Sequence, residues 1–114
     1  SISPIFSMIA IILLIAAIIA VNRNKLLVSG LLTLIVVGIH NILGLLLGLS
    51  VGKVLKLKYD KTTALAIEVG MQNSGLAVTL AATNFALNPL ATLVGAIFSV
   101  WHNISGAIFA SLRR

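Results

Sequence analysis

The sequence of 114 residues lacks cysteine altogether and holds only two acidic residues, against eight lysines and arginines. Without cysteine, the chain has no disulfide framework, no thiolate metal site and no cysteine nucleophile. The net charge of +6 would suit a nucleic acid partner. The basic residues, however, lie only between or after apolar runs, which is typical of membrane topology and of contact with lipid headgroups. We therefore expect no nucleic acid partner.

Apolar residues make up 60% of the chain, charged residues 9%, and the mean hydropathy is +1.18. A soluble domain of this size cannot bury so much apolar surface, whereas runs of about 20 apolar residues match the thickness of a bilayer. The sequence predicts an all-α membrane protein that lies in the lipid bilayer. It starts at Ser1 without the basic start and cleavage site of a signal peptide, so we expect it to begin within a longer chain.

Four transmembrane helices are predicted, over residues 4–21, 26–50, 62–84 and 89–112, with a polar turn at residues 22–25. Six basic residues then fall on one side of the membrane, and only Arg23 and Lys25 on the other. The six are Lys53, Lys56, Lys58, Lys61, Arg113 and Arg114. By the positive-inside rule, both chain ends lie in the cytoplasm, with the chain in the inner (plasma) membrane.

Small residues repeat every four positions in two predicted helices. Gly44, Gly48 and Gly52 form one stripe, which we interpret as a packing face that lets backbones approach closely. A second stripe follows the last helix and includes a polar member, Asn103. Its residues are Ala91, Gly95, Ser99, Asn103, Ala107 and Ser111.

Glu68 is the only carboxylate inside a predicted span, and no lysine or arginine within a span can neutralise it. An ionised carboxylate there costs about 3 kcal/mol on insertion scales, so Glu68 must be protonated, bind a cation or face water. It could also reach the interface, because it lies only a turn or two past Thr62. We favour the functional interpretation, since intramembrane carboxylates commonly mark ion or proton sites.

The residues after Glu68 predict that the third helix is broken between Gly70 and Gly75, since each glycine weakens a helix by about 1 kcal/mol. A break would release carbonyl oxygens for a cation and N–H groups for an anion. Inside a membrane, such a break is tolerated only where protein or a water-filled cavity surrounds it. We interpret this run as a coupling-ion site for sodium next to an anion site.

Other polar residues within spans allow two interpretations. His102 and Asn103, beside Trp101, suit either hydrogen bonds between helices or contact with a substrate, while His40 and Asn41 suit bonds between helices. The sequence contains no catalytic triad order, phosphate-binding loop or metal-spaced histidine pair, so we do not expect an enzyme.

Two stretches resemble the last two helices of the bile acid:sodium symporter family, bacterial homologues included: EVGMQNSGLAVTLA from Glu68 and GAIFSVWHNISGAIFA from Gly95. The resemblance implies a transporter of ten helices in two inverted repeats, with two broken helices that cross at mid-membrane. The present chain would be its C-terminal portion, about helices seven to ten, and the remaining helices of the same transporter would be its partners. The implied substrates are bile acids or other organic anions, with sodium as the coupling ion.

The resemblance also implies roles for seven residues. Glu68 through its carboxylate, Val69 and Met71 through backbone carbonyls, and Gln72 through its side-chain oxygen would bind sodium. Asn73, His102 and Asn103 would face the substrate cavity. Four helices alone do not complete a sodium shell, so we expect the rest of the transporter to supply the remaining ligands.

Two alternatives remain open from the residues alone. A small four-helix exchanger could trade protons at Glu68 for cationic drugs, although its carboxylate would be expected in an early helix. A membrane anchor or assembly subunit would explain the small-residue stripes but not the polar run that contains Glu68.

Overall fold

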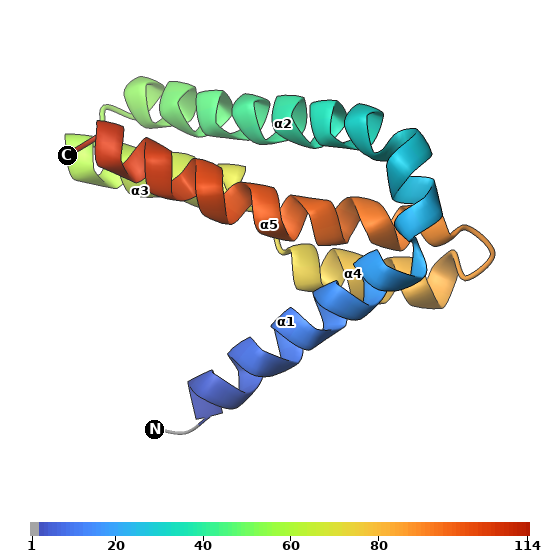
Figure 1. The fold of residues 1–114 in the computed structure, drawn as a ribbon. Helices are drawn as coiled ribbons and strands as arrows, with labels where there is room; N and C mark the ends of the chain where they lie inside the picture. Colours follow the sequence, from blue (N-terminus) through green and yellow to red (C-terminus); the bar gives the residue numbers. More distant parts are fainter. Residues whose placement is uncertain (1–2) are drawn as a thin grey trace.

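The computed structural model describes residues 3–114, which form helices α1 (Ser3–Val21), α2 (Arg23–Val54), α3 (Tyr59–Gly70), α4 (Ser74–Asn84) and α5 (Pro89–Leu112) (Figure 1). Helices α1, α2 and α5 are long and apolar enough to cross a membrane. The shorter α3 and α4 together make up the third predicted span, interrupted at residues 71–73. The predicted all-α membrane fold with a broken third helix is therefore confirmed.

The predicted polar turn at residues 22–25 is wrong, because only Asn22 separates α1 from α2. The Asn22 N–H donates to the Ile18 carbonyl, and the Asn22 carbonyl accepts from the Leu26 N–H, so helical hydrogen bonds continue across the junction. Arg23 is already the first residue of α2. The chain reverses direction across this junction and the first turns of α2 (Figure 1).

Helix α2 also runs four residues beyond its predicted end, to Val54, and packs against α3 through the glycine stripe. A Cβ atom built on Gly44 would lie 2.9 Å from the Val69 carbonyl oxygen, and one on Gly48 would lie 2.5 Å from the Ala66 Cα. Backbone atoms of α3 therefore occupy the space that side chains on this face of α2 would need. The interpretation of the stripe as a packing face is confirmed.

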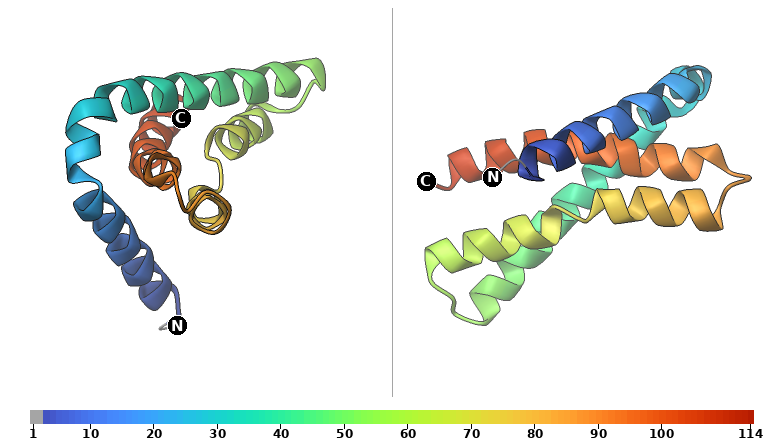
Figure 2. Two further views of the ribbon diagram at one scale, coloured as in Figure 1. Left: turned by 90° about the vertical axis from the view of Figure 1, so that its right-hand side faces the viewer. Right: turned by 90° about the horizontal axis from the view of Figure 1, so that it is seen from below.

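Helix α4 packs on the first half of α5, antiparallel to it (Figure 2). A Cβ atom on Gly95 would lie 2.8 Å from Val78 Cγ2, and the Ser74 hydroxyl donates a 2.9 Å hydrogen bond to Ser99. Only this part of the second stripe is buried, since Asn103 is exposed. The two halves of the broken span thus pack on different helices, α3 on α2 and α4 on α5.

The C-terminus lies at the same end of the molecule as the lysine-rich loop between α2 and α3 (Figure 1). The Arg113 Nε–H donates to Thr63 Oγ1 at 3.1 Å, and the Arg113 guanidinium lies 4.0 Å from the centre of the Tyr59 ring. The end of α5 is therefore tied to the beginning of α3. The six basic residues that the sequence assigns to one side lie at one end of the helices.

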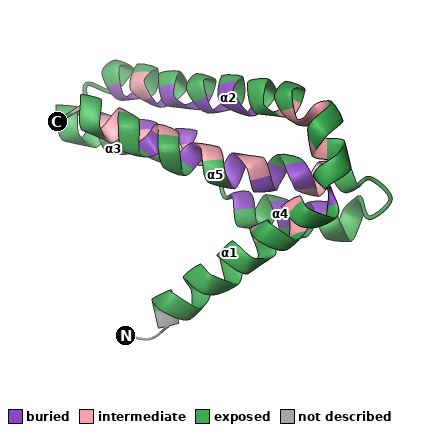
Figure 3. Cartoon of the chain, viewed as in Figure 1, coloured by how far each residue is buried: buried purple, intermediate pink, exposed green. Residues whose placement is uncertain are grey.

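Much apolar surface remains exposed in this chain. None of the α1 span from Pro4 to Val21 is buried inside the protein, and α1 is exposed along nearly its whole length (Figure 3). The outer face of α2 is exposed as well, whereas Val37, Leu45, Leu93 and Phe98 are buried between helices. Lipid or further helices must cover the exposed apolar faces.

A substitution in α2 tests the close contact with α3. We expect Gly48→Ala to lower the thermal unfolding temperature of the purified complete protein, because its Cβ would meet α3 backbone, and overpacking of this kind costs about 1–3 kcal/mol. Gly38→Ala is the matched control in the same helix, since its Cβ would meet Trp101 Cζ2 at an ordinary 3.5 Å. Equal unfolding temperatures for the two variants would contradict the packing described here.

Candidate functional site

The third span breaks at the point where its packing partner changes. Before the break, α3 packs on α2, and after it, α4 packs on α5. Helix α3 ends at Gly70, which is buried, and a Cβ atom there would lie 2.7 Å from Leu45 Cδ2. Met71 leaves the helical conformation, with φ −93° and ψ 65°. Asn73 then begins α4 as its N-cap, and its Oδ1 accepts a 3.0 Å hydrogen bond from the Leu76 N–H. Ser74 already belongs to α4, so the break is one residue shorter than predicted.

A buried amide on α2 links the end of α3 at this junction to α5. Asn41 Nδ2 donates a 2.9 Å hydrogen bond to the Gly70 carbonyl oxygen, and Asn41 Oδ1 accepts one of 3.2 Å from Trp101 Nε1. Asn41 is 1% exposed. The interpretation of Asn41 as a residue that bonds between helices is confirmed. Its link to the break, and the role of Trp101, are found only in the structure.

The α3 side of the break holds the acidic residue. Glu68 is exposed, and its carboxylate makes no hydrogen bond or ion pair with the residues that the structure describes. The Val69 carbonyl accepts a 2.8 Å hydrogen bond from Gln72 Nε2, which orients the Gln72 side chain beside α3. The Glu68 carboxylate and the Gln72 Oε1 atom, four residues apart, are therefore oxygens without a hydrogen-bond partner among residues 3–114.

These oxygens suit a hard monovalent cation better than a transition metal. Carboxylate, amide and carbonyl oxygens are the ligands that hard cations prefer. Within residues 3–114 no group of three histidine, aspartate or glutamate side chains could hold a metal ion. The C-terminal end of α3 adds partial negative charge near Glu68. The four residues predicted to bind sodium are neighbours in the chain, at the end of α3 and in the break that follows it.

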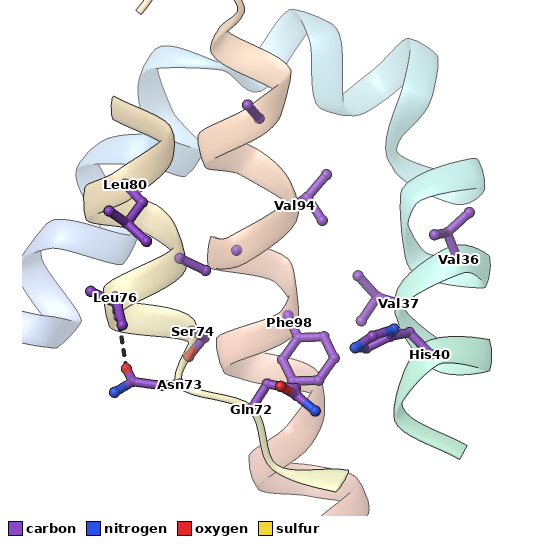
Figure 4. A pocket seen from close by; sticks show the side chains of 13 residues that line it. Val36, Val37, His40, Gln72, Asn73, Ser74, Leu76, Leu80, Val94 and Phe98 are labelled. Atoms are coloured by element: carbon purple, nitrogen blue, oxygen red, sulfur yellow. Dashed lines mark hydrogen bonds between the residues drawn. The ribbon is translucent and has the colours of Figure 1, made fainter. Parts of the chain in front are cut away.

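A cavity of about 520 Å³ lies on the α4 side of the break, between α2, α4 and α5. Gln72, Asn73, Ser74 and His40 supply its polar groups, and Phe98 is among its apolar lining residues. In Figure 4, the Gln72 and His40 side chains both lie near the Phe98 ring, and Asn73 turns back toward Leu76. The His40 and Phe98 ring centres are 5.7 Å apart, edge to face.

The other two residues expected to contact substrate lie elsewhere. His102 is buried, its ring centre is 5.4 Å from that of Phe98, and its Nδ1 atom has no hydrogen-bond partner among the described residues. Asn103 is exposed, and its Nδ2 donates to the Ser99 carbonyl one turn earlier. Neither lines the 520 Å³ cavity. Of the three predicted substrate residues, only Asn73 does.

Sequence reasoning did not place His40 or Phe98 at this cavity. His40 was expected to bond between helices, yet it is exposed and lines the cavity. Its spacing from Val36 and Val37, one turn away, could have shown which face of α2 it shares. Nothing in the sequence indicates that this face lies opposite Gln72.

No family model matches the sequence. The chain is 49% identical over 108 residues to the uncharacterized sodium-dependent transporter YocS of Bacillus subtilis (strain 168), an alignment that covers 95% of the chain. It is also similar to the probable chloroplastic sodium/metabolite cotransporter BASS1 of Arabidopsis thaliana and of Oryza sativa subsp. japonica. The identities are 36% over 82% of the chain and 34% over 84% of it.

The chain belongs to the bile acid:sodium symporter family. It spans 33% of the length of the Bacillus relative and 23% of each plant relative. All three relatives are named as transporters that use sodium, and none as an enzyme. Membership of the symporter family gives the broken span and its lone carboxylate a functional context that geometry alone does not.

Asn73 caps α4 and also lines the cavity, and two variants separate these roles. We expect Asn73→Ala to destabilise the complete protein by about 1 kcal/mol, because the Leu76 N–H loses its acceptor. Asn73→Ser keeps a capping oxygen and should retain most of the stability. Thermal unfolding of the two purified variants measures this difference. Equal losses of stability would show that the cap is unimportant.

Proposed function

We propose that this chain contributes part of a sodium site and part of the substrate cavity to a sodium-coupled symporter of organic anions. The observation that carries the proposal is the position of Glu68, an unpaired carboxylate at the C-terminal end of a half-helix inside a broken span. The kinship with sodium-dependent transporters supports sodium rather than a proton as the coupling ion. The complete transporter would have ten helices in two inverted repeats, of which this chain supplies the C-terminal four spans.

In this proposal, sodium binds on the α3 side of the break. The ligands are the Glu68 carboxylate, the Gln72 side-chain oxygen, and the carbonyls of Val69 and Met71. The Val69 carbonyl now accepts from Gln72 Nε2, so ion binding would require that short contact to open or the carbonyl to serve both. Glu68 is exposed, and its remaining partners would belong to helices outside this chain.

The anion would bind on the other side of the same break. The N-terminus of α4 presents partial positive charge there, and anions are stabilised at such ends. Asn73 begins α4 and lines the cavity, whose wall is otherwise mainly apolar. A mainly apolar wall with a few polar groups suits an amphipathic organic anion such as a bile acid. His102 and Asn103 would contact the same substrate from farther along α5, on a face completed by the missing helices.

The coupling follows from this arrangement. Sodium on α3 fixes the break in the conformation in which α4 meets the substrate, so occupancy of one site stabilises the other. Both chain ends would lie in the cytoplasm, with the lysine-rich loop and the C-terminal arginines on that side of the inner membrane. The four-helix drug exchanger is less well supported, since the relatives of this chain are several times its length and use sodium.

Uptake by cells that express the complete reading frame tests the proposal. With labelled taurocholate as the probe, uptake in sodium buffer should exceed uptake in choline buffer at least tenfold. Glu68→Ala should abolish the difference, because the remaining oxygens carry no net charge to balance the ion. Rapid filtration at matched surface abundance gives the initial rates.

Asp60→Ala is the matched control, because Asp60 is the only other acidic residue of the chain and lies in the same helix, in its first turn. It should retain sodium-dependent uptake. If taurocholate is not carried, a panel of smaller organic anions replaces it. If the wild type took up every anion tested at the same rate in sodium and in choline buffer, the proposed coupling would be contradicted.

A further inference from the structure

The Gly70 carbonyl has an unusual hydrogen-bond donor. In a continuous helix it would accept from the N–H group four residues later, which belongs to Ser74. Here the Ser74 N–H donates to the Gln72 carbonyl at 2.9 Å, and Asn41 Nδ2 occupies the Gly70 oxygen at 2.9 Å. An amide from α2 has thus replaced the donor that would close the break.

Trp101 fixes the direction of that amide. The indole N–H can only donate, so the Asn41 atom 3.2 Å from it must be the oxygen, and the Asn41 NH₂ group must then face Gly70. The Gly70 carbonyl can only accept, which agrees. The bond to Gly70 is buried and the bond to Trp101 is partly buried, and Asn41 itself is almost completely buried. Without Asn41, the Gly70 carbonyl, which belongs to a buried residue, would lose its hydrogen-bond partner.

From these contacts we infer that Asn41 is a positioning residue for the sodium site: it holds the third span open at Gly70, and Trp101 holds Asn41. Asn41 touches neither the ion nor the substrate. It acts through the peptide that follows Gly70, which directs Met71 and Gln72 away from the helix axis and toward the position of the ion. This inference rests on the proposed function for the identity of the ion, but not for the opening of the helix.

Sodium-dependent uptake by the complete protein measures the effect on the site. A hydrogen bond between membrane helices contributes enough to change an equilibrium roughly 3- to 20-fold. Asn41→Leu should therefore raise the sodium concentration for half-maximal uptake by that factor. The KM for the organic anion at saturating sodium should change less than about twofold. Trp101→Phe keeps the Asn41–Gly70 bond and should produce a smaller rise.

Ser99→Ala is the matched control, because it removes another buried hydrogen bond between helices, on the α4 side of the break. It should leave the sodium dependence unchanged. If Ser99→Ala shifted the sodium dependence as much as Asn41→Leu does, the inference would be overturned, since any loss of packing would then have the same effect. An unchanged sodium dependence in Asn41→Leu at normal surface abundance would also overturn it. If Asn41→Leu does not reach the membrane, Trp101→Phe decides by the same criterion.

Hydrogen exchange in sodium-free buffer tests the inference independently of transport. The N–H groups of Gln72 and Asn73 make no hydrogen bond to the residues that the structure describes, so they should exchange quickly in the wild type. In Asn41→Leu or Trp101→Phe, the span can close and their exchange should slow. Unchanged exchange in both variants would overturn the role of Asn41. A wild type without sodium dependence would instead refute the proposed function alone.

Discussion

The requirement that backbone polar groups find partners inside a membrane governs this structure. A span interrupted at residues 71–73 releases carbonyls and N–H groups that water cannot satisfy in a lipid environment. The structure meets that requirement for three of the released groups, through Asn41 at the Gly70 carbonyl, Gln72 at the Val69 carbonyl and Asn73 at the Leu76 N–H. Each of these side chains is an amide, which can donate and accept at once. The break is therefore held by specific groups, and the oxygens left over are those available to an ion.

The two half-helices pack on different helices, α3 on α2 and α4 on α5. Glycines in α2 bring α3 into backbone contact, and Gly95 does the same for α4 on α5. Glu68 lies on α3, in the pair formed by α2 and α3. The cavity that Asn73 lines lies between α2 and the pair formed by α4 and α5. Asn41 and Trp101 connect the pairs at the level of the break. A change in the angle between the two half-helices would alter the ion ligands and the cavity together, which is the physical basis of the proposed coupling.

The sequence predicts the spans and the break well, because long apolar runs and the glycines around a polar segment are local signals. The glycine stripe of α2 was predictable for the same reason. The extent of the turn after α1 was not, since Asn22 keeps the helical bonds that its polar neighbours seemed to exclude. The contact of Asn41 with Gly70 joins residues 29 apart, and that with Trp101 residues 60 apart. No local pattern encodes such pairs, nor does it show that His40 faces the cavity while His102 does not.

The central claim is that sodium binds at Glu68 beside the break, and direct titration of the purified complete protein tests it most simply. Calorimetry with sodium chloride, against potassium chloride at the same ionic strength, should give saturable heat for sodium alone. Glu68→Gln keeps the size of the side chain and removes its charge, so it should weaken sodium binding at least tenfold. Equal sodium affinity in the wild type and Glu68→Gln would contradict the account, and the ion site would then lie elsewhere in the transporter.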